Sequence, residues 1–213
     1  MGNNSRLMTN TIFPTAYLPS IALMAAIVRH DKIVIELHET FPKQTHRNRT
    51  VIGTANGPMT LSVPVVRPQG NHTETADIKI SYSEKWNVIH WRAIESAYNS
   101  SPYFLYYRDG IEQILKRPYE HLTEMNEELL KYLLKCLKHP CEIEYSNEYY
   151  GTDKYDSDYR DLYSYKHPER NPKCPEYTQV FCDRHQFNSN ISILDTLFNL
   201  GPETAEYLMK IEA

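Results

Sequence analysis

A short basic segment, Lys43 to Arg49, is the part of the sequence best suited to bind an anion. Lys43, Arg47 and Arg49 place three positive charges within seven residues, and the Asn48 amide lies between the two arginines. If Arg47 begins a strand, Arg47 and Arg49 project from the same face because side chains alternate along a strand. Two adjacent guanidinium groups can hold a phosphate or a carboxylate bidentately. The segment predicts a site for a phosphorylated, nucleotide-linked or carboxylate substrate; the alternative is a solvated loop whose arginines pair with surface acids.

His90 is the first candidate for proton transfer. It follows Trp86 by four positions, so the two side chains share one face of a predicted helix. Partial burial on that face would keep the pKa of the imidazole near neutrality, which suits general acid–base catalysis. The alternative is a structural histidine that only hydrogen-bonds a backbone carbonyl.

His38 and Glu39 form a second candidate catalytic pair, at the end of a predicted strand. Ligands of open α/β sheets gather beyond the carboxyl ends of the strands, which is where these two side chains should lie. His72, in the loop of residues 70–73, would line the same cleft if that loop folds towards it. The alternative is that His72, as a single histidine in a loop, is only exposed to solvent.

The motifs of several enzyme classes are absent from the sequence. It contains no Gly-x-x-x-x-Gly-Lys, Gly-x-Gly-x-x-Gly, Gly-x-Ser-x-Gly or His-x-Gly-His. The usual His and Cys spacings of metal sites are also missing, so we expect no metal site, and no particular cofactor is indicated. Cys182 lies near Asp183 and His185 and is a possible nucleophile, but a buried, inert thiol is the simpler interpretation.

The charge and hydropathy of the chain narrow the class of partner. A formal net charge of −4 and a pI near 6.1 argue against a general nucleic-acid binder and give no basis for binding an anionic membrane surface. The longest apolar run, Ile21 to Val28, is too short to span a bilayer, and the first residues lack an apolar stretch of signal-peptide length. We therefore expect a cytoplasmic protein with free thiols.

A strand–helix–strand unit must position the segments around residues 14–20 and 38–49. Thr11 to Phe13 is a strand candidate, Pro19 suits the first turn of a helix that runs to about Arg29, and Ile33 to Leu37 is dense in β-branched residues.

An antiparallel hairpin should follow. Two apolar runs, 51–52 and 59–65, flank Asn56-Gly57, a strong short-range signal for a hairpin turn. The alternation of apolar and polar residues over 77–82 indicates one more half-buried strand.

Two helices with clear signals come next. Ser83 is the expected N-cap of the first, which ends before Pro102. The second carries an apolar stripe from Leu122 to Leu137 and stops at Pro140.

A short strand over 141–145 and a helix that starts at Ser192 complete the predicted elements. The predicted fold is α/β: one domain over 1–213 with a mixed β-sheet, made of the N-terminal strand–helix–strand unit plus the antiparallel hairpin and packed by several helices.

Residues 146–176 stand apart as a polar, tyrosine-rich insert. Thirty residues without periodicity are unusual inside a compact domain, where they are typical of a functional flap or a disordered insert. Disorder alone would not select so many tyrosines, so we expect the insert to order against the body of the protein or against a partner. Its tyrosines are Tyr149, Tyr150, Tyr155, Tyr159, Tyr163 and Tyr165.

Four stretches of the chain resemble one known family, the WbqC-like proteins. The stretches are Phe13-Pro-Thr-Ala-Tyr-Leu-Pro-Ser20, Glu39 to Arg49, Trp86 to Trp91 running into Tyr98 to Phe104, and the C-terminal pair Tyr177 to Phe181 and Asn190 to Pro202. The chain departs from the family pattern where Phe13 replaces a glutamine and where His38-Glu39 replaces an aspartate pair. Tyr17 and Gln179 lie within the matching stretches and join the candidate substrate-binding residues; for Gln179 the alternative is hydrogen bonding to its own neighbours.

The resemblance implies a broad function. WbqC-like proteins are bacterial, and some are encoded among genes for surface polysaccharides such as O-antigen. A member is expected to be a transferase that acts on an activated sugar or another anionic small molecule. The rival interpretation is a non-catalytic binding or scaffold protein that contacts a protein partner through residues 146–176.

Overall fold

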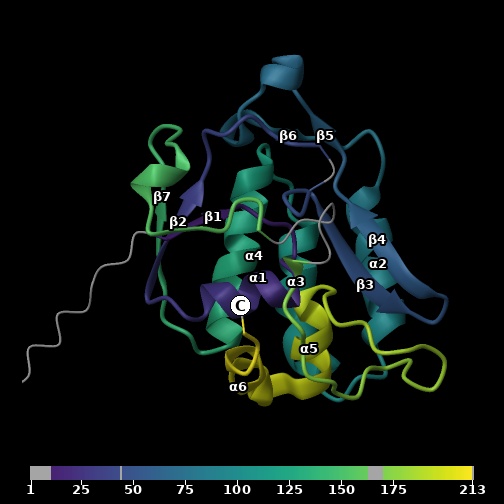
Figure 1. The fold of residues 1–213 in the computed structure, drawn as a ribbon. Coiled ribbons are helices and arrows are strands. Elements are labelled where there is room, and N and C mark those ends of the chain that lie inside the picture. The colour runs from purple at the N-terminus through teal and green to yellow at the C-terminus, as the bar shows by residue number, and fades with distance from the viewer. Residues whose placement is uncertain (1–10, 44, 163–169, 213) are drawn as a thin grey trace, which may run out of the picture.

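A four-stranded parallel sheet forms one side of the molecule. The computed structural model describes residues 11–43, 45–162 and 170–212 (Figure 1). The sheet has the order β7-β2-β1-β8, and every neighbouring pair of strands is parallel. Its strands are β1 (Thr11–Pro14), β2 (Lys32–Glu36), β7 (Glu142–Tyr145) and β8 (Ser157–Asp158).

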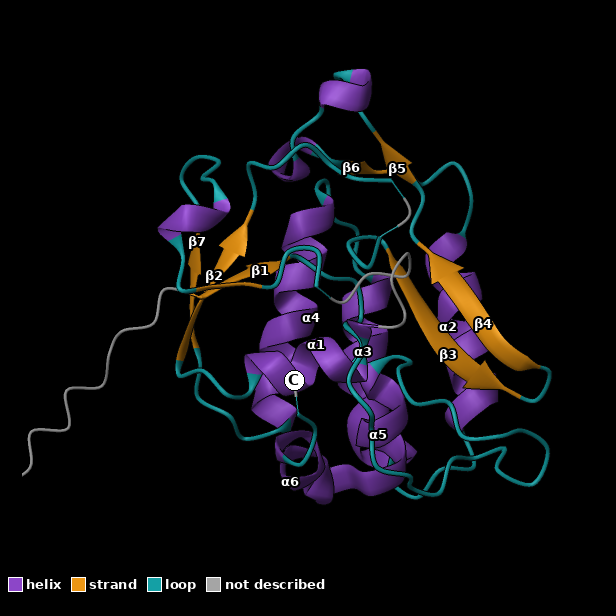
Figure 2. Ribbon diagram, in the orientation of Figure 1, coloured by secondary structure: helices purple, strands orange, loops and turns teal. Residues whose placement is uncertain are grey.

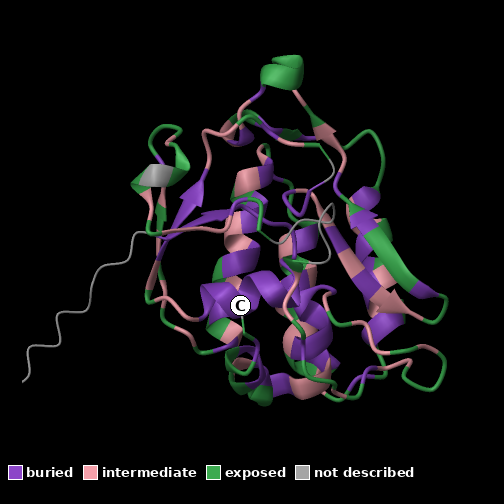
Figure 3. Cartoon of the chain, in the orientation of Figure 1, coloured by how far each residue is buried: buried purple, intermediate pink, exposed green. Residues whose placement is uncertain are grey.

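Helix α1 (Ile21–Ile27) connects β1 to β2 and is buried on all sides. Its seven residues are all apolar and all buried, which is the composition expected of a helix surrounded by other elements. The Ser20 side chain caps it by accepting a hydrogen bond from the Leu23 backbone N–H at 3.3 Å. The predicted strand–helix–strand unit is therefore confirmed, and it supplies the centre of the buried interior (Figure 3).

The antiparallel strands do not join the parallel sheet. Strand β3 (Arg49–Thr54) pairs only with β4 (Gly57–Ser62), and β5 (Val65–Val66) pairs only with β6 (Lys79–Ile80). Figure 2 shows the hairpin and the parallel strands on opposite sides of a layer of helices. The predicted single mixed sheet thus divides into three. The chain leaves β2 through a loop, and one edge of β3 is occupied instead by Ser192, whose N–H donates to the Val51 carbonyl at 2.7 Å.

The helical layer is larger than the sequence pattern indicated. Helix α3 (Phe104–Lys116) was not predicted, since its exposed Leu105 and Tyr106 interrupt the apolar periodicity. Helix α2 (Trp86–Tyr98) begins without a side-chain cap, so the prediction of Ser83 as its N-cap is wrong. The remaining helices are α2 (Trp86–Tyr98), α3 (Phe104–Lys116), α4 (Leu122–Cys136), α5 (Ile193–Leu200) and α6 (Thr204–Met209), with 3-10 turns at Gly70–His72, Thr75–Asp77, Thr152–Lys154 and Gly201–Glu203.

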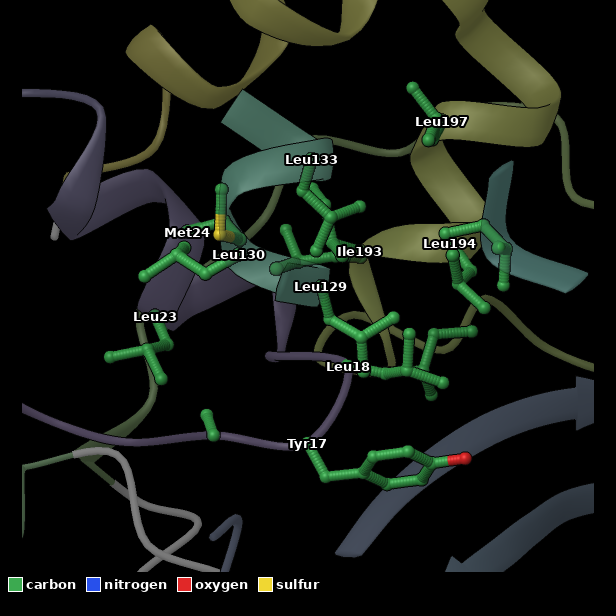
Figure 4. Close-up of a cluster of buried hydrophobic side chains, with 14 of the residues drawn as sticks. Tyr17, Leu18, Leu23, Met24, Leu129, Leu130, Leu133, Ile193, Leu194 and Leu197 are labelled. Atoms are coloured by element: carbon green, nitrogen blue, oxygen red, sulfur yellow. The ribbon is translucent and has the colours of Figure 1, made fainter. Parts of the chain in front are cut away.

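The sheets and helices share one hydrophobic core. Figure 4 shows Tyr17 and Leu18 lying beneath side chains of α4 and α5, with Leu23 and Met24 of α1 beside them. The α/β fold class is confirmed. None of the helices in the described ranges combines the length and apolarity needed to cross a membrane.

Gly201, at the end of α5, allows the tightness of side-chain packing to be tested at one position. Its φ is +56°, and a Cβ there would lie 2.5 Å from the Tyr103 ring, so Gly201→Ala adds a steric clash to backbone strain. We expect a loss of about 2–4 kcal/mol in the free energy of unfolding. The matched control is Gly57→Ala, which also has positive φ but meets nothing within 4 Å and should cost about 1–2 kcal/mol. Chemical denaturation would measure both, and equal losses would contradict the packing argument.

Candidate functional site

An open cleft of about 630 Å³ lies at the carboxyl end of the parallel sheet. Its walls come from two distant parts of the chain, the loop that follows β2 and the tyrosine-rich insert. This is the position at which ligands of open α/β sheets bind. The lining residues are His38, Glu39, Thr40, Pro42, Tyr149, Thr152, Asp158, Arg160 and Asp161.

His38 is oriented in this cleft by a carboxylate. Its Nδ1 lies 2.9 Å from Glu74 Oε2, and the His38 side chain remains 30% exposed. Two backbone hydrogen bonds hold the loop that carries Glu74 against the loop that carries His38, namely Thr75 N–H to the Glu39 carbonyl and Ala76 N–H to the Leu37 carbonyl. A carboxylate accepts hydrogen bonds, so the proton lies on Nδ1 and Nε2 is left as the basic nitrogen.

Glu39 binds the guanidinium of Arg47, which the sequence predicted to bind an anionic ligand. Arg47 Nε donates to Glu39 Oε1 at 2.5 Å and Arg47 Nη2 donates to Oε2 at 2.7 Å, while Nη2 also donates to the Arg160 carbonyl at 3.2 Å. Burial raises the pKa of Glu39, and the neighbouring Arg47 opposes that rise. Because Arg47 is buried and already bound bidentately, it is not available to grip a second carboxylate or phosphate in the same way.

A second buried ion pair fixes the opposite wall of the cleft. Glu36 is fully buried at the end of β2 and accepts from Arg160 Nη1 at 3.0 Å and from the Ser146 hydroxyl at 2.7 Å. Arg160 also donates to both oxygens of Asp158 and to the Tyr150 carbonyl. A buried carboxylate is tolerated only when such partners replace water, so the pair anchors the insert to the sheet.

The described part of the tyrosine-rich insert orders against the body of the protein. Tyr159 stacks on Phe13 of β1 with ring centroids 4.7 Å apart. The rings of Tyr149 and Tyr155 face the Arg160 guanidinium at 5.2 and 5.8 Å. Tyr163 and Tyr165 lie outside the described residues.

His90 and Tyr17 meet each other in the core, away from this cleft. The Tyr17 hydroxyl and His90 Nδ1 share a hydrogen bond of 2.9 Å, and the Trp86 ring packs edge-on to His90 at 5.1 Å, as the helical spacing predicted. Burial lowers the pKa of His90 to about 4, although a hydrogen bond to the Ser62 backbone opposes it. His90 thus does not titrate near neutrality, and neither residue lines the cleft.

The other residues of the basic segment Lys43 to Arg49 do not form one site. Strand β3 begins at Arg49, so Arg47 precedes the strand and the two arginines do not alternate along it. Arg49 Nε is buried without a hydrogen-bond partner. The Asn48 amide donates to the Val63 carbonyl at 2.9 Å, a structural role. Lys43 is exposed one residue beyond Pro42 of the cleft wall.

His72 and Gln179 also lie outside the cleft. His72 is exposed in the turn before Glu74 and does not line it. Gln179 belongs to a separate buried network, in which its Nε2 donates to Asp195 Oδ1 at 3.1 Å and its Oε1 accepts from Asn188 N–H at 2.9 Å. Its own neighbours therefore satisfy it, which is the alternative that the sequence left open.

Cys182 differs from its predicted state. Its thiol is exposed, whereas the sequence suggested a buried one. The nearby His185 directs Nε2 to the Ala55 carbonyl at 2.9 Å. Across the part of the chain that the structure describes, no three His, Cys, Asp or Glu side chains are grouped to hold a metal ion.

The sequence identified two residues of the cleft, His38 and Glu39, and missed their partners. Glu74 lies 36 residues from His38 and Arg160 lies 124 residues from Glu36, so no local spacing connects them. The one available signal was the insert itself, which contributes Tyr149, Asp158 and Arg160.

Comparison with known proteins agrees with the resemblance noted in the sequence. A model of the WbqC-like protein family matches residues 15–164. The uncharacterized protein Rv1507c of Mycobacterium tuberculosis is 24% identical over 222 residues, which cover 92% of this chain and 96% of the relative. No solved structure matches.

The Glu36–Arg160 pair yields a stability prediction. Arg160→Met leaves Glu36 buried and unpaired, so the free energy of unfolding should fall by about 3–5 kcal/mol. Adding Glu36→Gln removes the stranded charge and should recover a large part of that loss. The control Arg184→Met removes an exposed arginine paired with Asp183 and should cost less than about 0.5 kcal/mol. Urea titration measures all three, and a loss below about 1 kcal/mol for Arg160→Met would refute the anchoring role.

Buried His90 yields a pH prediction. Its pKa is about 4 in the folded protein against 6.5 for the ordinary side chain, so the unfolded chain binds more protons between these values. Stability should therefore be lost as pH falls from about 6.5 towards 4, by up to about 1.4 kcal/mol per pH unit. His90→Asn should make the pH dependence of the unfolding free energy shallower in that window. An unchanged slope in His90→Asn would count against the assignment.

Proposed function

This chain belongs to the WbqC-like protein family, and on that premise we propose that it is a transferase acting on an activated sugar, with the cleft beyond β2 as its active site. The observation that carries the proposal is the His38–Glu74 pair beside Glu39 in that cleft. The assignment of the protein to surface-polysaccharide biosynthesis rests on the family resemblance alone.

His38 acts as the general base. Nδ1 is committed to Glu74, so Nε2 takes the proton from a hydroxyl or amino group of the acceptor as that group attacks the anomeric carbon of the donor. The bond from this carbon to the phosphate oxygen breaks, and the nucleoside diphosphate leaves with the electron pair of that bond. The Glu74 carboxylate then stabilises the imidazolium that forms and keeps the ring in one orientation, as the acid of a catalytic triad does.

Glu39 and Tyr149 position the sugar. Arg47 fixes the Glu39 carboxylate, which can accept a hydrogen bond from a sugar hydroxyl at the cleft wall. Tyr149 is 58% exposed and presents an aromatic surface to the same cleft, suited to the apolar face of a sugar ring. Both residues touch the cleft, so both would contact a substrate bound in it.

The anionic part of an activated sugar requires a cation that is not already paired. Arg47 and Arg160 are held by buried carboxylates, which leaves Lys43 at the rim as the proposed phosphate contact. No carboxylate among the described residues lies within ion-pairing distance of Lys43. The proposed anion site therefore contains Lys43, whereas the sequence predicted a cluster of Lys43, Arg47 and Arg49.

A non-catalytic binding protein is the second candidate, because the same exposed Tyr149 could contact a protein partner. Deleting the insert would not separate the two candidates, since residues 149–161 supply much of the cleft wall. A change at His38 does separate them, because a binding surface on the insert does not need a base.

The base is tested by His38→Asn. We expect turnover to fall by about 10²–10⁴-fold, the usual contribution of a general base, while substrate binding persists. Glu74→Gln should reduce turnover less and leave binding intact. Turnover would be followed by mass spectrometry with a panel of nucleoside-diphosphate sugars and host metabolite extract, and binding by calorimetry.

The matched control is His72→Asn, which alters an exposed histidine outside the cleft. It should retain full turnover. If the wild-type protein converts a sugar substrate and His38→Asn converts it equally fast, the proposed role of the cleft is wrong.

A further inference from the structure

The open cleft beyond β2 carries more negative than positive charge. Three of its lining residues are acidic, and two further carboxylates contact cleft residues. The guanidinium groups of Arg47 and Arg160 offset part of this charge, and Lys43 adds one positive charge at the rim. A cleft with an excess of one sign of charge attracts ligands of the opposite sign. The carboxylates are those of Glu39, Asp158 and Asp161 in the lining and of Glu36 and Glu74 beside it.

Asp161 differs from the other four carboxylates because it is exposed and unpaired. The Arg160 side chain, next to it in the sequence, is already held by two other carboxylates, and no cation among the described residues forms an ion pair with Asp161. Its carboxylate is therefore open to a ligand in the cleft. The other pairs are Glu36 and Asp158 with Arg160, Glu39 with Arg47, and Glu74 with His38.

Asp161 lies near Glu39 and therefore near the proposed base. Burial raises the pKa of Glu39, and the neighbouring Arg47 opposes that rise. The negative charge of Asp161 adds to the rise, together with that of Glu36. Because charges at a protein surface are screened beyond roughly 10 Å, this repulsion places Asp161 within about the length of one sugar of Glu39. His38 directly precedes Glu39 and lines the same cleft, so one ligand can reach both Asp161 and His38.

An ammonium group is the cation that best matches Asp161. A carboxylate offers only acceptors and an ammonium group only donors, and hydrogen bonds between the two are stronger than those between neutral groups. A divalent metal ion would need several more oxygen ligands from the protein. The described residues contain no group of three acidic, His or Cys side chains that could supply them.

The same charges separate the two substrates of the proposed transfer. A nucleoside diphosphate is repelled by the carboxylates and attracted by Lys43, which lies at the rim of the loop that follows β2. Asp161 belongs to the opposite wall, on the insert, and attracts a cation instead. The exposed Tyr149 ring on that wall suits a sugar. The acceptor side of the cleft therefore fits a sugar that carries a positive charge.

We propose that the acceptor is an amino sugar whose ammonium group binds to Asp161 while one of its hydroxyl groups faces His38 Nε2. This inference rests on the proposed function, since it names the acceptor of that reaction. The hydroxyl oxygen forms the bond to the anomeric carbon of the donor, and its proton passes to Nε2. The nucleoside diphosphate leaves with the electron pair of the broken carbon–oxygen bond. The ammonium group keeps its protons throughout, so Asp161 determines specificity and takes no part in the bond changes.

The recognition is tested in the absence of a donor, with D-glucosamine and D-glucose, which differ in one amino group. At a pH of about 7 an amino group of ordinary pKa is largely protonated. In resonance titrations of the full-length protein, glucosamine should bind about three- to tenfold more tightly than glucose, as expected for one charge-assisted contact at an exposed carboxylate. Asp161→Asn should remove this preference. The control Asp183→Asn, which changes an exposed acid outside the cleft, should retain it. Equal binding of the two sugars to the wild-type protein, or an undiminished preference in Asp161→Asn, would overturn the inference.

Turnover separates this inference from the proposed function. With a nucleoside-diphosphate sugar as donor, Asp161→Asn should raise the KM of an amino-sugar acceptor about three- to tenfold and change kcat less, because the ammonium contact is the same in the ground state and the transition state. If transfer depends on His38 but neutral sugars are accepted equally well, the acceptor assignment is wrong and the transferase proposal stands. If glucosamine is preferred in binding but no donor supports transfer, the transferase proposal is wrong and the recognition of an ammonium group by Asp161 stands.

Discussion

The structure depends on one buried turn, residues 15–20, whose backbone polar groups must find partners inside the protein. Those partners come from distant segments. Tyr17 N–H donates to the His46 carbonyl, the Leu18 carbonyl accepts from the Thr50 hydroxyl, and the Pro19 carbonyl accepts from Ile193 N–H. Leu18 adopts a φ of +45°, an unfavourable conformation for leucine that the surrounding contacts impose. Satisfying this turn sets the positions of β3 and of the start of α5.

The proposed active site inherits its geometry from the same turn. Asn126 donates to both Thr15 and the Arg47 carbonyl, which places the Arg47 side chain where it meets Glu39. Arg47 then reaches the carbonyl of Arg160, whose own side chain is held by Glu36. One buried ion pair, Glu36–Arg160, therefore joins the end of β2 to the insert, and the other, Glu39–Arg47, is linked to the insert through the Arg160 carbonyl. The inner side of the cleft is thus held by buried ion pairs, whereas Tyr149 and Asp161 are exposed at its outer side.

Local rules predicted the parts of this molecule that local interactions determine. The Asn56-Gly57 turn, the strand–helix–strand unit and the apolar stripe of α4 all follow from periodicity and turn chemistry, and the strand-end rule placed His38 and Glu39 in the cleft. The pairings of charged groups could not be predicted in this way. Whether Arg47 binds a ligand or Glu39 depends on where a buried loop brings the two together, and the depth at which His90 lies depends on Tyr17, 73 residues earlier.

The burial of the N-terminal unit also has a consequence for how the protein is made. The Ala22 N–H is satisfied by the Asn190 side chain, 168 residues later, and Ser20 forms a bridge with Ser192. During synthesis, β1 and the wholly apolar α1 therefore emerge from the ribosome long before the segment that covers them. Contacts of such long range slow folding and leave apolar surface exposed in the meantime. During translation the seven apolar residues of α1 therefore stay without this cover until the C-terminal segment has been synthesised.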